Sequence, residues 1–224
     1  MQSYIPLLDE ETKVFLLEAL TLGKAGKAAV NPRPIFLRLN LSVGLSLNYG
    51  ARMESQSDLF REIVYVEDMI SNFRSTTSNL QDYIPLLRWR PKNAVSKGAR
   101  EMSDRRAQYI GQFDRDLDAR IEKGTEKPCI RVNAMRDEEA KLNDREMMSL
   151  NLTMLAAGLD TMNSAVGWGI AMLANNLDVQ EKAVKAIREL YPEDQPLCDV
   201  GDDQSCRYLV ILVKEILRYD KHSS

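Results

Sequence analysis

The sequence predicts a mainly α-helical fold, and two observations carry that prediction. In most of the chain, apolar residues recur at intervals of three or four positions, which places them on one face of a helix. Segment starts also favour helices, as where Asn31 can cap a helix and Pro32 can occupy its first turn. The chain has 224 residues, 44% of them hydrophobic, which is enough for one large or two small domains with an ordinary core.

Three helices are expected in the first part of the chain. Asp9–Leu22 carries acidic residues at its start, where the helix dipole favours negative charge. Apolar residues alternate with other residues from Ile35 to Leu47, which by itself would indicate a strand. The length of this segment and its start at Asn31-Pro32-Arg33-Pro34 favour a buried helix instead. A third helix is expected from Asp58 to about Thr76, where the apolar spacing is again helical.

The second part of the chain is predicted to alternate helices with short breaks. A long amphipathic helix with one wet face is expected over Ala94–Glu122, and Gly124–Pro128 ends it. Met147–Asn175 is nearly apolar all round, which is typical of a buried core helix. Asp178 and Glu181 have the spacing of a capping box, so a helix is expected from there to about Leu190. The other expected segments are loops at Tyr83–Pro91 and Tyr191–Asp203 and a last helix at Tyr208–Arg218.

The most informative segment is Ala157-Gly158-Leu159-Asp160-Thr161, in the middle of the apolar helix. Glycine costs about 1 kcal/mol relative to alanine inside a helix, and a buried carboxyl or hydroxyl costs more unless it has a partner. Gly158 would let a flat or bulky ligand approach the backbone closely. Thr161 can return its hydroxyl to the carbonyl of Ala157. Asp160 points about 100° away from Thr161, so the two could form a proton relay to a ligand.

Two other interpretations of this segment stay open. Thr161 could be a satisfied core threonine and Asp160 a paired buried acid, with no role in chemistry. Leu152–Ala174 is also long enough to span a membrane. Against a membrane span, an acid near the centre costs about 2.5–3.5 kcal/mol, and the flanks lack a one-sided basic bias. A buried core helix is therefore favoured.

Glu215 and Arg218 form a second constellation, because residues three apart are neighbours on a helix surface. The helix around them is unusually apolar, so the pair is expected to brace a buried turn rather than to lie on the surface. The methionines and Trp168 are expected to fill gaps in the core.

Composition excludes several classes of function. A net charge of −3 and a pI near 5.4, with no basic cluster, give no reason to expect a nucleic-acid partner. Cys129, Cys198 and Cys206 lack the spacing of a zinc site or a disulfide framework and indicate reduced thiols. His222, the only histidine, is expected to be solvated in the tail. No signal peptide is visible at the N-terminus.

The order of these motifs resembles the cytochrome P450 haem-thiolate monooxygenases. The Ala-Gly-x-Asp-Thr helix, Leu173–Lys182 and the Glu215-x-x-Arg218 helix look like the family's long distal helix, the short helix after it and its Glu-x-x-Arg helix. Upstream, Asn31-Pro32-Arg33-Pro34 and Leu47–Gly50 are similar to fungal members of the phenylacetate-hydroxylase type. The resemblance implies the central part of the P450 fold, with residues 1–219 as a partial P450 domain and 220–224 as an unrelated-looking tail.

The resemblance also implies a cofactor and site residues. The cofactor is haem b, with Ala157, Gly158 and Thr161 lining its distal face. Thr161 and Asp160 are the catalytic pair, the alcohol beside dioxygen and its acidic neighbour in proton delivery. Met162 departs from the small hydroxyl residue that often follows the threonine.

Further roles and partners follow from the same resemblance. Glu215 and Arg218 are structural residues that steady the proximal side. The full-length protein would hydroxylate a small, aromatic organic substrate with O2 and electrons from an NADPH-cytochrome P450 reductase-type donor. It is expected to be intracellular, and full-length relatives would lie on the cytoplasmic face of the endoplasmic reticulum.

Two parts of the family pattern are missing from these 224 residues. The family holds iron through a cysteine in a Phe-x-x-Gly-x-Arg-x-Cys-x-Gly loop after the Glu-x-x-Arg helix, whereas all three cysteines here precede that helix in other settings. The Trp-x-x-x-Arg helix that meets the haem propionate is also missing. The sequence therefore predicts a fragment, as a truncated gene model would give, that has no metal ligand, binds haem poorly and is inactive alone. The alternative is a non-catalytic helical interaction protein derived from a P450 that has lost haem binding.

Overall fold

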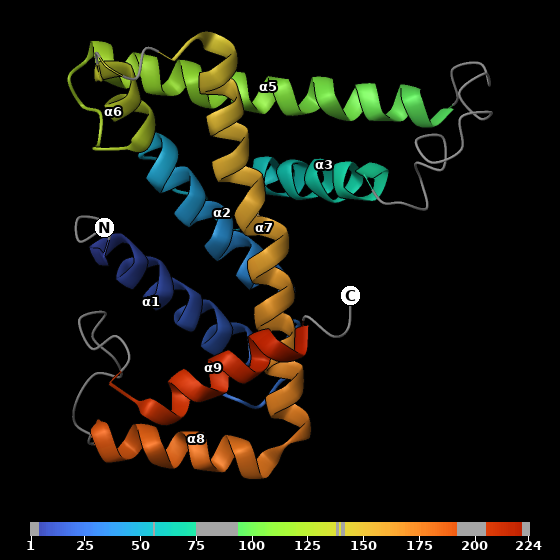
Figure 1. Cartoon of the computed structure of the whole chain (residues 1–224), viewed down its shortest axis with the longest axis vertical. Helices are drawn as coiled ribbons and strands as arrows, with labels where there is room; N and C mark the ends of the chain where they lie inside the picture. The colour runs from blue at the N-terminus through green and yellow to red at the C-terminus, as the bar shows by residue number, and fades with distance from the viewer. Residues whose placement is uncertain are drawn as a thin grey trace. The chain divides into compact units, whose positions relative to one another are not determined.

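The computed structural model describes residues 5–55, 57–74, 94–137, 139, 142–191 and 205–220. Within these ranges the chain forms eight α-helices and no strand (Figure 1), which confirms the prediction of a mainly α fold. The helices are α1 (Ile5–Leu22), α2 (Arg33–Tyr49), α3 (Asp58–Arg74), α5 (Ala94–Glu122), α6 (Ile130–Arg136), α7 (Asp144–Asn175), α8 (Leu177–Leu190) and α9 (Arg207–Asp220).

The chain divides into two compact units. Unit 1 comprises Met1–Gly44 and Ala157–Ser224, and unit 2 comprises Leu45–Ala156. Two long helices, α2 and α7, each contribute residues to both units.

In unit 1, α1 and α2 are joined by an aromatic contact and by buried charge. The rings of Phe15 and Phe36 stack with their centroids 4.6 Å apart. Arg38 donates from Nη1 to Oε2 of Glu11 at 2.8 Å and from Nε to Oε2 of Glu18 at 2.7 Å. Because Arg38 and Glu11 are both buried, salt screens this pair far less than a surface pair.

The C-terminal part of unit 1 packs α9 between neighbouring helices. α8 and α9 lie against each other (Figure 1). α9 also approaches α7 closely at Gly169, where an added Cβ would lie 3.1 Å from Cδ1 of Ile216. The glycine thus permits a close contact between these two helices.

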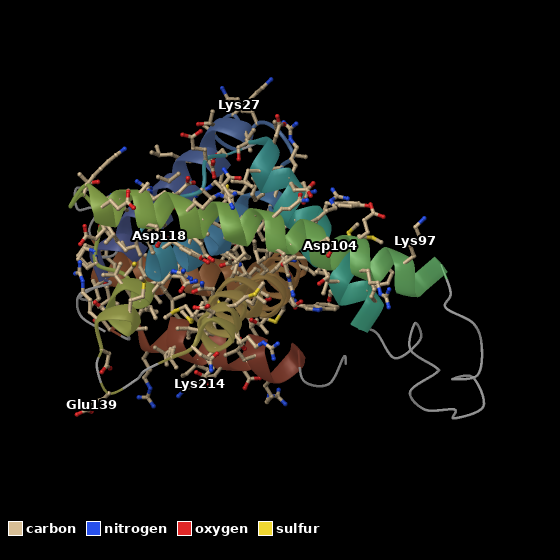
Figure 2. All side chains as sticks on the ribbon, turned by 90° about the horizontal axis from the view of Figure 1, so that it is seen from above. Lys27, Lys97, Asp104, Asp118, Glu139 and Lys214 are labelled. Carbon is tan, nitrogen blue, oxygen red and sulfur yellow. The ribbon has the colours of Figure 1, made fainter. Side chains whose placement is uncertain are left out.

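Unit 2 is organised around the long helix α5, which packs against α3 (Figure 1). Arg105 bridges to Glu62 with two hydrogen bonds of 2.7 and 2.5 Å. Arg106 makes a similar two-point contact with Glu67. The opposite face of α5 is polar, with Asp104 and Asp118 exposed (Figure 2), so the predicted amphipathic helix is confirmed with the same bounds.

Several helix starts differ from the sequence predictions. α7 begins at Asp144, because Oδ1 of Asn143 accepts from the backbone N–H of Glu146 while the Glu146 carboxylate accepts from the N–H of Asn143. The capping box predicted at Asp178 and Glu181 is wrong: α8 starts one residue earlier, and Asp178 instead contacts Lys182 at 3.3 Å. The short helix α6 was not predicted. The loop predicted at Tyr83–Pro91 lies outside the described residues, as does Tyr191–Asp203 beyond Tyr191.

The prediction that α7 is buried on all sides is wrong for its C-terminal half. Met162 is 51% exposed and Trp168 is 55% exposed, so Trp168 does not fill a core gap. Within the ranges the structure describes, no helix combines the length and the apolar character that a membrane span requires.

Candidate functional site

One face of α7 carries two of the residues that the sequence analysis singled out, Gly158 and Thr161. Gly158, Thr161, Ala165 and Trp168 are spaced by three or four residues, so they follow one another along one side of the helix. Thr161 and Trp168 are exposed, and Gly158 and Ala165 are partly exposed. This side of the helix, here called the Gly158 face, is the candidate site.

The backbone of α7 is open to approach at the Gly158 face. A Cβ added at Gly158 would meet no atom of the described residues within 4 Å, apart from its chain neighbours and the nearby backbone of its own helix. Leu155 and Leu159, on another side of the same helical turns, are buried. The helix is therefore packed on the side of these two leucines, whereas no described atom lies within 4 Å of the position that a Gly158 Cβ would take. The side chains of Ala157 and Asp160 lie outside the described part of the structure.

The Glu215–Arg218 pair forms on α9 as the spacing predicts. Oε2 of Glu215 accepts from Nε of Arg218 at 2.9 Å and from a terminal guanidinium nitrogen at 2.7 Å. The expected burial is wrong, because the Arg218 side chain is 61% exposed and that of Glu215 is 48% exposed. The apolar residues of α9 do not surround the pair; one of them, Ile216, faces Gly169 of α7 instead.

Only two of the three cysteines, Cys129 and Cys206, lie in the described part of the chain. Cys129 is fully buried and directly precedes α6, and Cys206 is partly buried and directly precedes α9. Cys198 and His222 lie outside the described residues. No group of three or more potential metal-ligating side chains occurs among the residues that are described.

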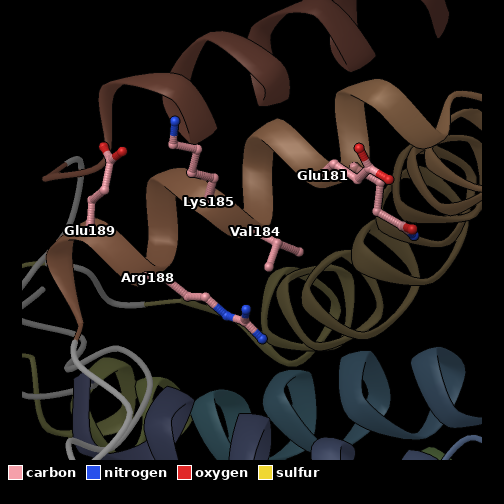
Figure 3. A pocket seen from close by; sticks show the side chains of 6 residues that line it. Glu181, Val184, Lys185, Arg188 and Glu189 are labelled. Atoms are coloured by element: carbon pink, nitrogen blue, oxygen red, sulfur yellow. The ribbon is translucent and has the colours of Figure 1, made fainter.

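A surface pocket of about 450 Å³ lies on unit 1, away from the Gly158 face. It is lined by Gln180, Glu181, Val184, Lys185, Arg188 and Glu189 of α8. All of these residues belong to one helix. Lys185 and Glu189 project to one side of α8, and Val184 and Arg188 project to the other (Figure 3). Charged residues of both signs line this hollow.

A set of polar contacts in unit 2 was not predicted from the sequence. Tyr49 donates its hydroxyl to Oδ1 of Asp114 at 3.0 Å, and Tyr109 donates to Oε1 of Glu67. Burial, and then the neighbouring carboxylate, raises the pKa of each tyrosine above its ordinary value of 10.0. Both tyrosines are therefore protonated hydrogen-bond donors at neutral pH. Their wide separation in sequence from these acids leaves no local pattern that could have revealed the contacts.

The comparisons with known proteins all indicate the same family. The cytochrome P450 family model matches residues 1–224. The chain is 53% identical over 220 residues to 3-hydroxyphenylacetate 6-hydroxylase of Emericella nidulans, a match that covers 98% of this chain and 43% of the relative. It is 42% identical over 222 residues to phenylacetate 2-hydroxylase of the same organism, covering 97% of this chain and 42% of the relative.

A third relative extends the match to another fungus. A cytochrome P450 monooxygenase of Mycosarcoma maydis is 36% identical over 221 residues, covering 97% of this chain and 41% of that protein. The chain thus spans less than half the length of these curated relatives. The match along the whole sequence, together with the helical fold, shows that this chain belongs to the cytochrome P450 family.

Proposed function

We propose that the gene product containing this chain is a haem-dependent monooxygenase that hydroxylates a small aromatic acid, and that the Gly158 face of α7 lies against the distal side of the haem. The observation that carries the proposal is the open space at Gly158 beside the exposed Thr161. A flat apolar macrocycle fits a helix side that has no Cβ in its path. The partly exposed Ala165 and the exposed Trp168 ring extend the same surface.

The substrate class is proposed from the relatives. Two of them, at 53% and 42% identity, bear names that describe hydroxylation of phenylacetate or its 3-hydroxy derivative. A phenylacetate has an apolar ring and one carboxylate, so it needs a mostly apolar pocket with a polar anchor. We expect phenylacetate or a ring-hydroxylated phenylacetate to be accepted.

Haem, when bound, supplies the iron at which O2 is activated for insertion of one oxygen atom into a C–H bond. The overall balance is R–H + O2 + 2 electrons + 2 protons giving R–OH + H2O. The two electrons come from a redox partner, for which an NADPH-cytochrome P450 reductase-type donor is the proposal. None of the three cysteines has the family setting, so residues are proposed for the distal side only and no axial ligand is assigned.

The chain's own contribution is to hold protons where the reaction consumes them. Thr161 Oγ1 would hold a proton on the distal side, and the Asp160 carboxyl would resupply it from a direction about 100° away around the helix. Ala157 and Gly158 would leave the groove in which dioxygen sits. Glu215 and Arg218 would be structural, through the ion pair that they form with each other on α9.

We propose that residues 1–219 form one partial P450 domain; the family model extends over residues 220–224 as well. For the whole protein, a site on the cytoplasmic face of the endoplasmic reticulum is proposed from the family resemblance. The alternative, a helical interaction protein without haem, receives no support from the comparisons.

The test is turnover by the full gene product. Haem-loaded enzyme, reductase and NADPH are incubated with phenylacetate and with 3-hydroxyphenylacetate, and products that have gained one oxygen atom are measured by mass spectrometry. Thr161→Ala should lower product formation by about 100-fold, the usual contribution of a general acid. Thr161→Ser, which keeps a hydroxyl, should restore most of the rate.

Thr12→Ala is the matched control. Thr12 is also an exposed helical threonine, and its hydroxyl donates to the carbonyl of Leu8 at 2.7 Å, but it lies on α1. Its replacement should leave turnover unchanged. Equal losses in the Thr161 and Thr12 variants, or no loss in Thr161→Ala, would overturn the assignment of Thr161. Absence of any oxygenated product from either acid would overturn the substrate class.

A further inference from the structure

A buried polar cluster in unit 2 joins four helices through Asp114 of α5. Oδ1 of Asp114 accepts from the hydroxyl of Tyr49 at 3.0 Å and from Nδ2 of Asn151 at 3.3 Å, and it lies 2.8 Å from Nη1 of Arg131. Asn48 donates from Nδ2 to the backbone carbonyl of Asn151 at 3.5 Å. These residues come from α2, α5, α6 and α7, which are otherwise separate in sequence.

Three buried polar atoms of this cluster have no hydrogen-bond partner among the residues that the structure describes. They are Oδ1 of Asn48, Oδ1 of Asn151 and Nε of Arg131. The two asparagine side chains are fully buried, and the Arg131 side chain is 12% exposed. A buried polar atom without a hydrogen bond is unfavourable because it loses its contacts with water and gains none in return, so three in one cluster call for a ligand.

The chemistry of the three atoms selects among ligands. Two are carbonyl-type acceptors and one is an N–H donor. A metal ion would satisfy the two oxygens but would be repelled by the Arg131 guanidinium, and an anion would satisfy Arg131 but not the oxygens. Water alone both donates twice and accepts, and buried waters typically make about three hydrogen bonds to such groups.

We propose that a buried water molecule is bound in this cluster, donating to the side-chain oxygens of Asn48 and Asn151 and accepting from Nε of Arg131. Arg131 also lines a surface pocket of about 520 Å³ next to Met147, which provides a route for solvent to reach the cluster. The water completes a polar link that fixes the first half of α7 to α2 and α6. The inference concerns the folding of unit 2 and does not depend on the proposed function.

A crystal structure of the protein that resolves ordered solvent tests the proposal directly. We expect a water oxygen at about 2.7–3.2 Å from at least two of the three atoms. An empty site, a metal ion, or side chains that pair with one another instead would each overturn the inference.

A substitution gives an independent test through the sign of its effect. In Asn48→Leu, the water loses an acceptor and the remaining polar groups lose their bridge, so the folded-to-unfolded ratio in urea titrations should fall by about tenfold or more. If the site is dry, the same change removes an unsatisfied oxygen and loses only the long 3.5 Å hydrogen bond to the Asn151 carbonyl, so that ratio should stay unchanged or rise. Asn133→Leu, at an exposed position of α6, controls for the higher helix propensity of leucine. Should Asn48→Leu fail to fold, the crystal structure of the unchanged protein decides.

Discussion

Replacing Gly158 by alanine should raise the stability of the fold while lowering the activity of the proposed site. The substitution adds one methyl group to the middle of α7. Gly158 has a helical backbone, and its added Cβ would touch nothing within 4 Å. Alanine should therefore be accepted without strain, whereas the same methyl group would project toward a haem bound at the Gly158 face.

The expected gain in stability follows from helix propensity alone. Glycine inside a helix is about 0.5–1 kcal/mol less favourable than alanine. Because no neighbour has to move, the full gain should appear in Gly158→Ala, which corresponds to a rise in Tm of about 1–4 °C for a protein of this size. Gly167 is the matched control, since it lies in the same helix and an added Cβ there also meets nothing within 4 Å. Gly169→Ala should gain less, because its Cβ would press on Ile216 at 3.1 Å.

The assay combines unfolding followed by far-ultraviolet circular dichroism with turnover by the haem-loaded gene product. We expect both Gly158→Ala and Gly167→Ala to raise stability, and only Gly158→Ala to reduce the rate of product formation. If Gly158→Ala is destabilising while Gly167→Ala is stabilising, the space beside Gly158 is filled by protein and the reasoning fails. If both variants keep full turnover, the glycine is not adjacent to the reacting group.

Three further predictions concern charged residues. Arg38→Met should lower the free energy of unfolding by about 3–5 kcal/mol, because the buried Glu11 carboxylate loses its 2.8 Å contact with the Arg38 guanidinium. The control is Arg61→Met, at an exposed pair with Asp58, which should change the free energy of unfolding by less than about 1 kcal/mol. Similar losses for the two variants in urea titrations would contradict the prediction. The hydrogen bond from the Arg105 guanidinium lowers the pKa of Glu62 below its ordinary 4.5. The stabilisation from this ion pair is therefore present above pH 4.5 and is lost as the pH falls through the lower pKa of the folded state. The Tm values of the wild type and Glu62→Gln should differ at neutral pH and converge in acid, and a constant difference across pH would refute the prediction. Arg218→Met should cost less than about 1 kcal/mol in this chain, because its pair with Glu215 is exposed, and a larger loss would show that the pair braces the fold.

The helices could largely be predicted from the sequence because their apolar periodicity is strong. α5 was predicted with its observed bounds, and α2 was recognised as a helix despite the alternation from Ile35 to Leu47. That alternation misleads because α2 is buried on nearly all sides, so a single apolar face does not develop. The start of α7 was missed by three residues because Asn143 and Glu146 cap each other inside a stretch that reads only as charged.

The sequence suggests candidate site residues, whose role stays a prediction, but it does not give their environment. Gly158 and Thr161 were found because glycine and a polar pair are unusual in an apolar helix, and Trp168 could have been added from its spacing of seven residues after Thr161. Burial was predicted less well: an apolar helix was expected to be enclosed, whereas Met162 and Trp168 are exposed. The Asp114 cluster could not be predicted, since its members come from four helices and only packing brings them together.

The central claim, that the Gly158 face of α7 is the distal wall of a haem site, is tested most directly by a crystal structure of the haem-loaded gene product. The account predicts porphyrin atoms within about 4.5 Å of the Gly158 Cα, in van der Waals contact, with the Thr161 hydroxyl on the same side of the ring. A haem bound elsewhere, with another protein segment packed against Gly158 and Thr161, would contradict it.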